Sequence, residues 1–410
     1  MEKQYCVSCG AAIAETDSFC FKCGSSVETT KTIQEVHNAS LVSQVSEEAP
    51  QRRTRKIKRH GKKIVFIPIL ILMILVPVIV ISSVSHMQKP LGTLTYDVPD
   101  SGITSIDLTI SNDIGSVDII YDDSISNLFE AVITVRGGLR ASFDDAVNFN
   151  HEIIGDRINI NFFHNNELRN LFRMKQLNHE IDILMNPTAT VDFDIQSATG
   201  SVSVEVEFED DLVIENLSLE SSTGSAKFYG NYLNNLTLGD VSLSSSTGSI
   251  VFDLEDSTNT YLTGLILHTS TGSVTADLGE YLTLDCSTVS LDTSTGSVTL
   301  AYSNIIHENN VYWSLSTSTG SVNLFIEQTI LSPTNASMDF VLDTSTGSVT
   351  TYCELDSEIG IEIDADTSTG SITLPNGNDY YVSSDFALKA IQYSFVLTTS
   401  TGSITANVVN

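Results

Sequence analysis

Four cysteines near the start of the chain have the spacing of metal ligands. Cys6 and Cys9 form one Cys-x-x-Cys pair, Cys20 and Cys23 form a second, and a glycine follows each pair. Four thiolates at this spacing can close a tetrahedral Zn²⁺ site, and each glycine lets the backbone turn around the sulfur. A closed four-cysteine site keeps no open position for a substrate, so we expect one structural zinc ion.

The segment that holds these cysteines, residues 1–26, is too short to bury a useful core. Metal ligation would therefore supply its folding energy. The segment resembles the short zinc ribbons found at the N-termini of many prokaryotic membrane proteins. A cytoplasmic protein is a candidate partner of this ribbon. Residues 27–63 read as a flexible polar linker that ends in a basic juxtamembrane run.

Residues 64–84 are apolar, carry no charge and predict a single transmembrane α-helix. Their length crosses the hydrocarbon core of about 30 Å. The basic run at 52–63 comes directly before them, and the positive-inside rule places this flank in the cytoplasm. A cleaved signal peptide is the competing interpretation, but the segment begins too far into the chain for a typical signal. We therefore predict a single-pass protein of the cell membrane with an extracytoplasmic C-terminal domain.

A five-residue phrase, Ser/Thr-Ser/Ala-Thr-Gly-Ser, occurs nine times after residue 196. The first five intervals between its glycines are 24 residues, and the last three are 27, 23 and 32. A fixed period in this range predicts stacked repeats that bury their apolar faces against one another. The glycines are Gly200, Gly224, Gly248, Gly272, Gly296, Gly320, Gly347, Gly370 and Gly402.

Apolar residues alternate on both sides of each glycine, at seven and five positions before it and two positions after it. This period of two predicts β-strands, and its phase changes at Thr-Gly, where glycine suits a corner. A leucine-rich repeat lacks support because its Leu-x-x-Leu-x-Leu frame is missing. The predicted fold class is mainly β: a single-stranded β-solenoid (β-helix) ectodomain, together with the small zinc ribbon and one transmembrane helix.

We expect the regular solenoid to occupy residues 193–410, and residues 91–192 to form its irregular first part or cap. The hydroxyls of the invariant threonine and serine beside each glycine are expected to form ladders along the corner. The repeats, for example Leu291–Val298, resemble the prokaryotic putative-adhesin β-solenoid family, with residues 111–119 as a degenerate early copy. This resemblance implies an exported, surface-located solenoid and supplies no catalytic residues.

The charge is strongly asymmetric. The chain has a formal net charge of −31, and residues 90–410 hold 8 basic and 44 acidic side chains. Such a surface repels nucleic acid, so no nucleic-acid partner is expected. The eight histidines are scattered, and no phosphate loop or Gly-x-Ser-x-Gly elbow occurs. Cys286 and Cys353 occupy different positions in distant repeats, so we predict two free, mostly buried thiols.

An enzyme is a further alternative, because some polysaccharide lyases and hydrolases are β-solenoids. The near absence of basic residues after residue 175 removes the base that a lyase of this shape needs. A hydrolase with paired carboxylates stays open, since Asp292, Asp343 and Asp366 would lie on one face. Their repetition favours a solvated stripe, so we predict no catalytic and no cofactor-binding residue.

The sequence thus predicts a non-catalytic cell-surface protein that adheres to or binds envelope components. A transmembrane envelope sensor that signals through the zinc ribbon is the alternative, and a glycan-active β-helix enzyme is a second one. The expected partners are the membrane, spanned once, and an envelope glycan or surface protein outside. The insertions at Leu331–Ala336 and Pro375–Asp385 interrupt the period, and variable loops on a rigid stack are where contacts are expected.

Overall fold

The computed structural model describes residues 4–5, 12–13, 89–99, 102–137, 147–164, 177–207, 211–231, 235–254, 259–280, 282–332, 334 and 336–409. The chain divides into two compact units, Met1–Ser82 and Ser83–Asn410. In the first unit, β1 (Gln4–Tyr5) pairs antiparallel with β2 (Ala12–Ile13). The four ribbon cysteines and the predicted span at 64–84 lie outside the described residues. Within those residues, no helix has the length and apolarity that crossing a membrane requires.

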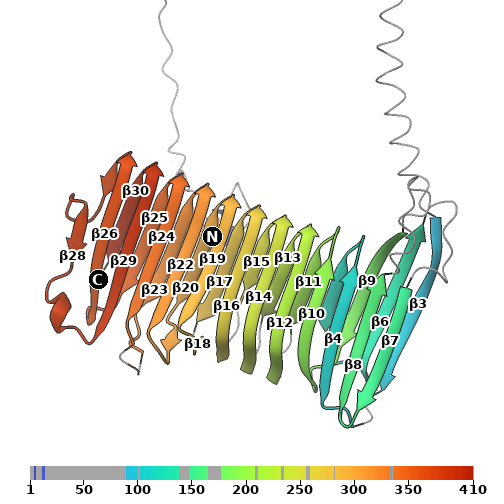
Figure 1. Cartoon of the computed structure of the whole chain (residues 1–410). Helices are drawn as coiled ribbons and strands as arrows, with labels where there is room; N and C mark the ends of the chain where they lie inside the picture. The colour runs from blue at the N-terminus through green and yellow to red at the C-terminus, as the bar shows by residue number, and fades with distance from the viewer. Residues whose placement is uncertain are drawn as a thin grey trace, which may run out of the picture. The chain divides into compact units, whose positions relative to one another are not determined.

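The second unit consists mainly of β-strands in two sheets, which Figure 1 shows as a long row of strands. In spatial order, sheet 1 contains β28 (Tyr380–Val382), β26 (Ile359–Thr369), β29 (Ile391–Thr401), β24 (Met338–Thr346), β22 (Val311–Thr319), β19 (Thr288–Thr295), β16 (Thr260–Thr271), β14 (Asn235–Thr247), β12 (Asp211–Thr223), β10 (Thr190–Ser197), β4 (Ser105–Asn112), β8 (Arg157–His164) and β7 (Val147–Ile154). The short strands β18 (Thr283–Leu284) and β21 (Ile306–His307) continue from β16.

Sheet 2 contains, again in spatial order, β27 (Ile372–Thr373), β30 (Ile404–Val409), β25 (Val349–Leu355), β23 (Val322–Gln328), β20 (Val298–Ser303), β17 (Val274–Glu280), β15 (Ile250–Asp253), β13 (Ala226–Asn231), β11 (Val202–Glu207), β5 (Val117–Tyr121), β9 (Leu177–Met185), β6 (Asn127–Gly137) and β3 (Lys89–Pro99). From β9 to β17, successive strands of the chain alternate between the two sheets, and most neighbouring strands are parallel. The arrangement is consistent with a β-helix-like fold.

The 24-residue period places like side chains beside one another in these sheets. Leu219 pairs with Leu243, which pairs with Leu267, and all three are fully buried. Along each strand buried and exposed residues alternate, because successive side chains point to opposite faces. The apolar faces of both sheets together form one continuous hydrophobic core. The inward positions predicted from the sequence are therefore confirmed in these strands.

Each repeat glycine makes the corner between the two sheets. All nine have φ between 141° and 159°, a conformation that L side chains rarely adopt. A Cβ at Gly272 would lie 2.0 Å from the carbonyl oxygen of Gly248 in the neighbouring repeat. The glycine is thus required twice, by its own backbone conformation and by the close approach of the next repeat.

The hydroxyl ladder at this corner differs from the one predicted. The hydrogen bonds come from the Ser or Thr three residues before each glycine, which is inward-facing; Thr293 Oγ1, for example, donates to the Gly272 carbonyl at 2.9 Å. The same bond recurs in all nine repeats, at 2.8 to 3.3 Å. The invariant threonine before each glycine is instead exposed, because its side chain falls on the outer side of the corner. The serine after the glycine does accept: Ser249 Oγ receives the Ser273 N–H at 3.4 Å.

Two matched substitutions distinguish how much the buried and the exposed hydroxyl of the corner contribute to stability. Thr293→Val keeps the shape of the side chain but leaves the Gly272 carbonyl without its donor, so we expect the free energy of unfolding to fall by about 1–3 kcal/mol. Thr295→Val, at the exposed position, should change it by less than about 0.5 kcal/mol. Urea denaturation followed by circular dichroism measures both. Equal losses in the two variants would contradict the assignment of the buried hydroxyl.

The spatial order of the repeats departs from the chain order at the C-terminal end. β29 and β30 come last in the chain, yet β29 lies between β24 and β26. The long segment 374–390 lets the chain return past β26. β28 within it pairs antiparallel with the outer side of β26. The repeats therefore do not stack in chain order here, and β28 covers β26, the last repeat strand of sheet 1.

The opposite end is closed in a similar way. Gly115 lies beside Gly200 in the glycine row, and β5 pairs in register with β11, so residues 111–119 form an early repeat. Beyond them, β8 and β9 add one further parallel layer. The antiparallel strands β7, β6 and β3 then follow at the edge. The irregular part of the sequence thus supplies the strands that end the stack.

A histidine replaces a leucine in one inward row. Leu262 pairs with Leu284, and Leu284 pairs with His307, whose exposed fraction is 1%. Neither ring nitrogen has a hydrogen-bond partner among the described residues. Burial lowers the pKa of His307 from 6.5 to about 3, because the charged imidazolium is poorly solvated there.

This histidine should make the protein sensitive to acid. Between pH 6.5 and about 3 the unfolded chain binds a proton at His307 that the folded chain does not, so stability falls as the pH is lowered, by up to about 1.4 kcal/mol per pH unit. His307→Leu continues the leucine row and should remove this contribution. Thermal unfolding at pH 7 and pH 4.5 measures the effect, with exposed His151→Leu as the control. An unchanged difference between the two pH values would refute it.

Candidate functional site

The two described strands of the first unit lie on either side of the first cysteine pair in the sequence. β1 ends at Tyr5, directly before Cys6, and β2 begins at Ala12, after Cys9. An antiparallel pair with the sequence Cys-x-x-Cys-Gly between its strands suits a zinc knuckle, and four thiolates are a donor set that Zn²⁺ prefers. Elsewhere in the described residues, no group of three or more His, Cys, Asp or Glu could hold a metal ion.

The outward carboxylates singled out in the sequence lie on sheet 1 but not on neighbouring strands. The row that contains them runs, in spatial order, through His268, Asp292, Ser316, Asp343, Thr398 and Asp366. Asp292 bonds to the His268 ring, and Asp343 accepts a hydrogen bond from Thr398. A hydroxyl residue therefore separates each of these aspartates from the next.

Both cysteines of the second unit are free. Cys353 is buried and Cys286 is half-buried. Burial raises the pKa of the Cys286 thiol to about 11 and raises that of Cys353 as well. Because the thiolate is the reactive form, neither residue is suited to act as a nucleophile at neutral pH.

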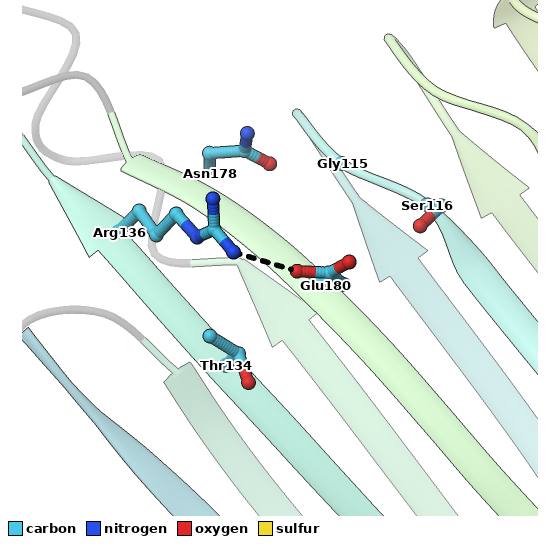
Figure 2. A pocket seen from close by; sticks show the side chains of 6 residues that line it. All are labelled: Gly115, Ser116, Thr134, Arg136, Asn178 and Glu180. Atoms are coloured by element: carbon cyan, nitrogen blue, oxygen red, sulfur yellow. Dashed lines mark hydrogen bonds and ion pairs between the residues drawn. The ribbon is translucent and has the colours of Figure 1, made fainter. Parts of the chain in front are cut away.

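A first pocket, of about 210 Å³, lies where the glycine row ends at Gly115. Figure 2 shows Arg136 of β6 and Glu180 of β9 pointing toward each other, with Asn178 and Thr134 beside them. The guanidinium and the carboxylate are 3.3 Å apart, and both side chains are about half exposed. Since Glu180 already neutralises Arg136, this pocket offers polar groups without an unpaired cation.

A second pocket is larger and more open, at about 550 Å³. Five of its six lining residues are polar, and the six come from three successive repeats: Ser287, Glu308, Asn309, Asn310, Thr334 and Ala336. We call it the insertion pocket, because Thr334 and Ala336 belong to the segment that lengthens one interval to 27 residues. Its volume falls in the range of small-molecule sites, whereas the Arg136 pocket is smaller than that range.

Comparison with known proteins agrees with part of this description. Residues 5–27 match the zinc-ribbon domain family, which indicates zinc binding by this segment in general terms. Two solved structures are similar to the chain. A putative cell adhesion protein from Clostridium sporogenes ATCC 15579 has 12% identity and a TM-score of 0.22, over 78% of this chain and 100% of the other. A putative adhesin from Bacteroides fragilis NCTC 9343 has 10% identity and a TM-score of 0.31, over 77% and 97%. No curated protein matches the chain.

Sequence reasoning found one side of the insertion pocket and missed the other. The broken period pointed to Leu331–Ala336, and Thr334 and Ala336 do line the pocket. Glu308, Asn309 and Asn310 were not singled out, although the run Glu-Asn-Asn interrupts the alternation of apolar residues. No pattern in the sequence predicts the contact between Arg136 and Glu180, because it depends on the antiparallel pairing of strands that are far apart in the chain; the two residues are 44 positions apart.

Proposed function

We propose that this chain is a non-catalytic, membrane-anchored surface protein whose β unit binds envelope components. The observation that carries the proposal is the insertion pocket, an open site lined mainly by polar residues at an interruption of the repeat. Irregular loops held by a rigid scaffold are the usual carriers of recognition. The regular faces around the pocket present repeated hydroxyl and carboxylate groups, which suit a long polymer better than a small substrate.

The absence of catalysis is part of the proposal, and the geometry of the acids supports it. Glycoside hydrolysis needs two carboxylates that flank one bond. Asp292, Asp343 and Asp366 lie along a regular exposed row and line neither of the two pockets described above. Asp292 and Asp343 are each engaged by a neighbouring side chain.

The proposed topology is a single span at residues 64–84, with the zinc ribbon in the cytoplasm and the β unit outside. The uncharged stretch and the basic run before it support this orientation. The balance of 8 basic and 44 acidic residues after residue 89 agrees with a surface kept away from anionic lipid. Cys6, Cys9, Cys20 and Cys23 are the proposed ligands of one structural zinc ion.

The zinc assignment predicts about one zinc ion per full-length chain, measured by elemental analysis after dialysis. Cys6→Ser combined with Cys9→Ser should lower the content to background, because two of the four thiolates are gone. The β-sheet signal of the second unit should persist, since that unit has its own core. Cys286→Ser is the matched control, and an equal loss of zinc in that variant would contradict the assignment.

The binding role is tested with the full-length chain in lipid nanodiscs and insoluble cell-wall material. We expect the chain to sediment with the wall material while empty nanodiscs stay in solution. No reducing sugar should be released over the same period. Lack of sedimentation would overturn envelope binding, whereas release of reducing ends would replace it with glycan cleavage.

A further inference from the structure

The insertion pocket has the features of a built site. Its segment between β23 and β24 is held by the preceding repeat: the Asn304 side-chain oxygen accepts the N–H groups of Thr329 and Ile330 at 2.9 and 3.0 Å. Ser332 and Thr334 both donate to the His307 carbonyl. Asn310 Oδ1 accepts the Ser337 N–H at 2.9 Å. A side of a pocket that is fixed in advance loses little entropy when a ligand binds.

The opposite side of the pocket is organised by Asp285. This carboxylate accepts hydrogen bonds from Asn309 Nδ2, at 2.7 Å, and from the hydroxyl of Tyr261. Asn309 is thereby oriented, and its amide oxygen stays available. Glu308 is exposed, and its carboxylate makes no hydrogen bond or ion pair with any residue that the structure describes, so this carboxylate can accept hydrogen bonds from a ligand.

An exposed aromatic residue follows these polar groups closely in the chain. Tyr312 is 43% exposed, lies two residues after Asn310 and faces outward as the second residue of β22. Its backbone N–H donates to the carbonyl of Ser287, which lines the pocket, at 3.0 Å. Such a ring offers an apolar face for the C–H groups of a sugar, while the amides, hydroxyls and carboxylate of the pocket meet sugar hydroxyls.

The charge of the surroundings restricts the ligand further. The insertion pocket carries Glu308 and no Lys or Arg in its lining. Residues 90–410 have a formal balance of 8 basic against 44 acidic side chains. A polyanion would be repelled by this surface, whereas an uncharged chain of sugars would not.

We propose that the insertion pocket, together with the Tyr312 ring, is a binding site for a neutral polysaccharide. Tyr312 packs against one sugar ring. The Glu308 carboxylate and the Asn309 amide oxygen accept hydrogen bonds from hydroxyls of the adjoining sugars, and the Asn310 amide nitrogen donates to them. This inference rests on the proposed envelope-binding function and names its ligand class and its site.

The experiment measures binding of the full-length chain in nanodiscs to three hexasaccharides by isothermal titration calorimetry. Cellohexaose and the hexamer of N-acetylglucosamine are neutral, and hexagalacturonate is the anionic comparison. We expect at least one neutral hexamer to bind and hexagalacturonate not to bind. Binding of neither neutral hexamer, or equal binding of the anionic one, overturns the proposal.

Matched variants locate the site. Tyr312→Ala should weaken binding about tenfold or more, and the isosteric Glu308→Gln about three- to tenfold. Tyr352→Ala and Glu354→Gln are the controls, because these exposed residues lie on β25 of sheet 2 and do not line the insertion pocket. Unchanged binding in Glu308→Gln and Tyr312→Ala, or an equal loss in the controls, contradicts the assignment. If the hexamers fail but the chain still sediments with wall material, this inference falls and envelope binding stands.

Discussion

The structure depends on the close approach of neighbouring backbones at the glycine corner. There, a residue without a Cβ leaves room for the carbonyl of the adjacent repeat, and a buried hydroxyl donates to that carbonyl. The two requirements hold the repeats in register, because a slip by one residue would bring a side chain into the space that the glycine leaves. Once the corner is in register, every inward position on both sheets stacks on a like position.

The register has consequences for the ends of the stack. Parallel strands in a continuous row leave unpaired backbone groups at both ends, and such edges promote association with other chains. In this protein the ends are built from segments that leave the repeat: β28 covers part of β26, and β7, β6 and β3 run antiparallel at the other end. Because β26 and β29 exchange places, the last repeat of the chain lies inside the stack, and β26 is the strand that β28 covers.

Recognition is proposed at a different kind of irregularity. In the outward row through Asp292, Asp343 and Asp366, a hydroxyl residue separates each aspartate from the next. The insertion after β23 breaks this regularity. The Thr329 N–H donates to the Asn304 side chain, and the Ser332 hydroxyl donates to the His307 carbonyl. His307 takes part through its backbone carbonyl while its ring occupies a leucine position in the core. The same residue therefore contributes its ring to the core and its carbonyl to the hydrogen bonds that hold the insertion.

The sequence by itself determined the repeat, the alternation of inward and outward residues and the need for glycine at the corner. These features are local, and each recurs often enough to be read without knowing which strands are neighbours. It also predicted the zinc ligands Cys6, Cys9, Cys20 and Cys23, since metal spacing is a short-range pattern, although those residues lie outside the described part of the chain.

Only the tertiary structure decided which hydroxyl bonds the corner carbonyl, because Thr293 and Thr295 differ merely in which side of the corner they face. It likewise decided the place of β29 between β24 and β26 and the contact of Arg136 with Glu180. These features depend on pairings between distant segments, whose free energies are set by the whole stack rather than by the local residues.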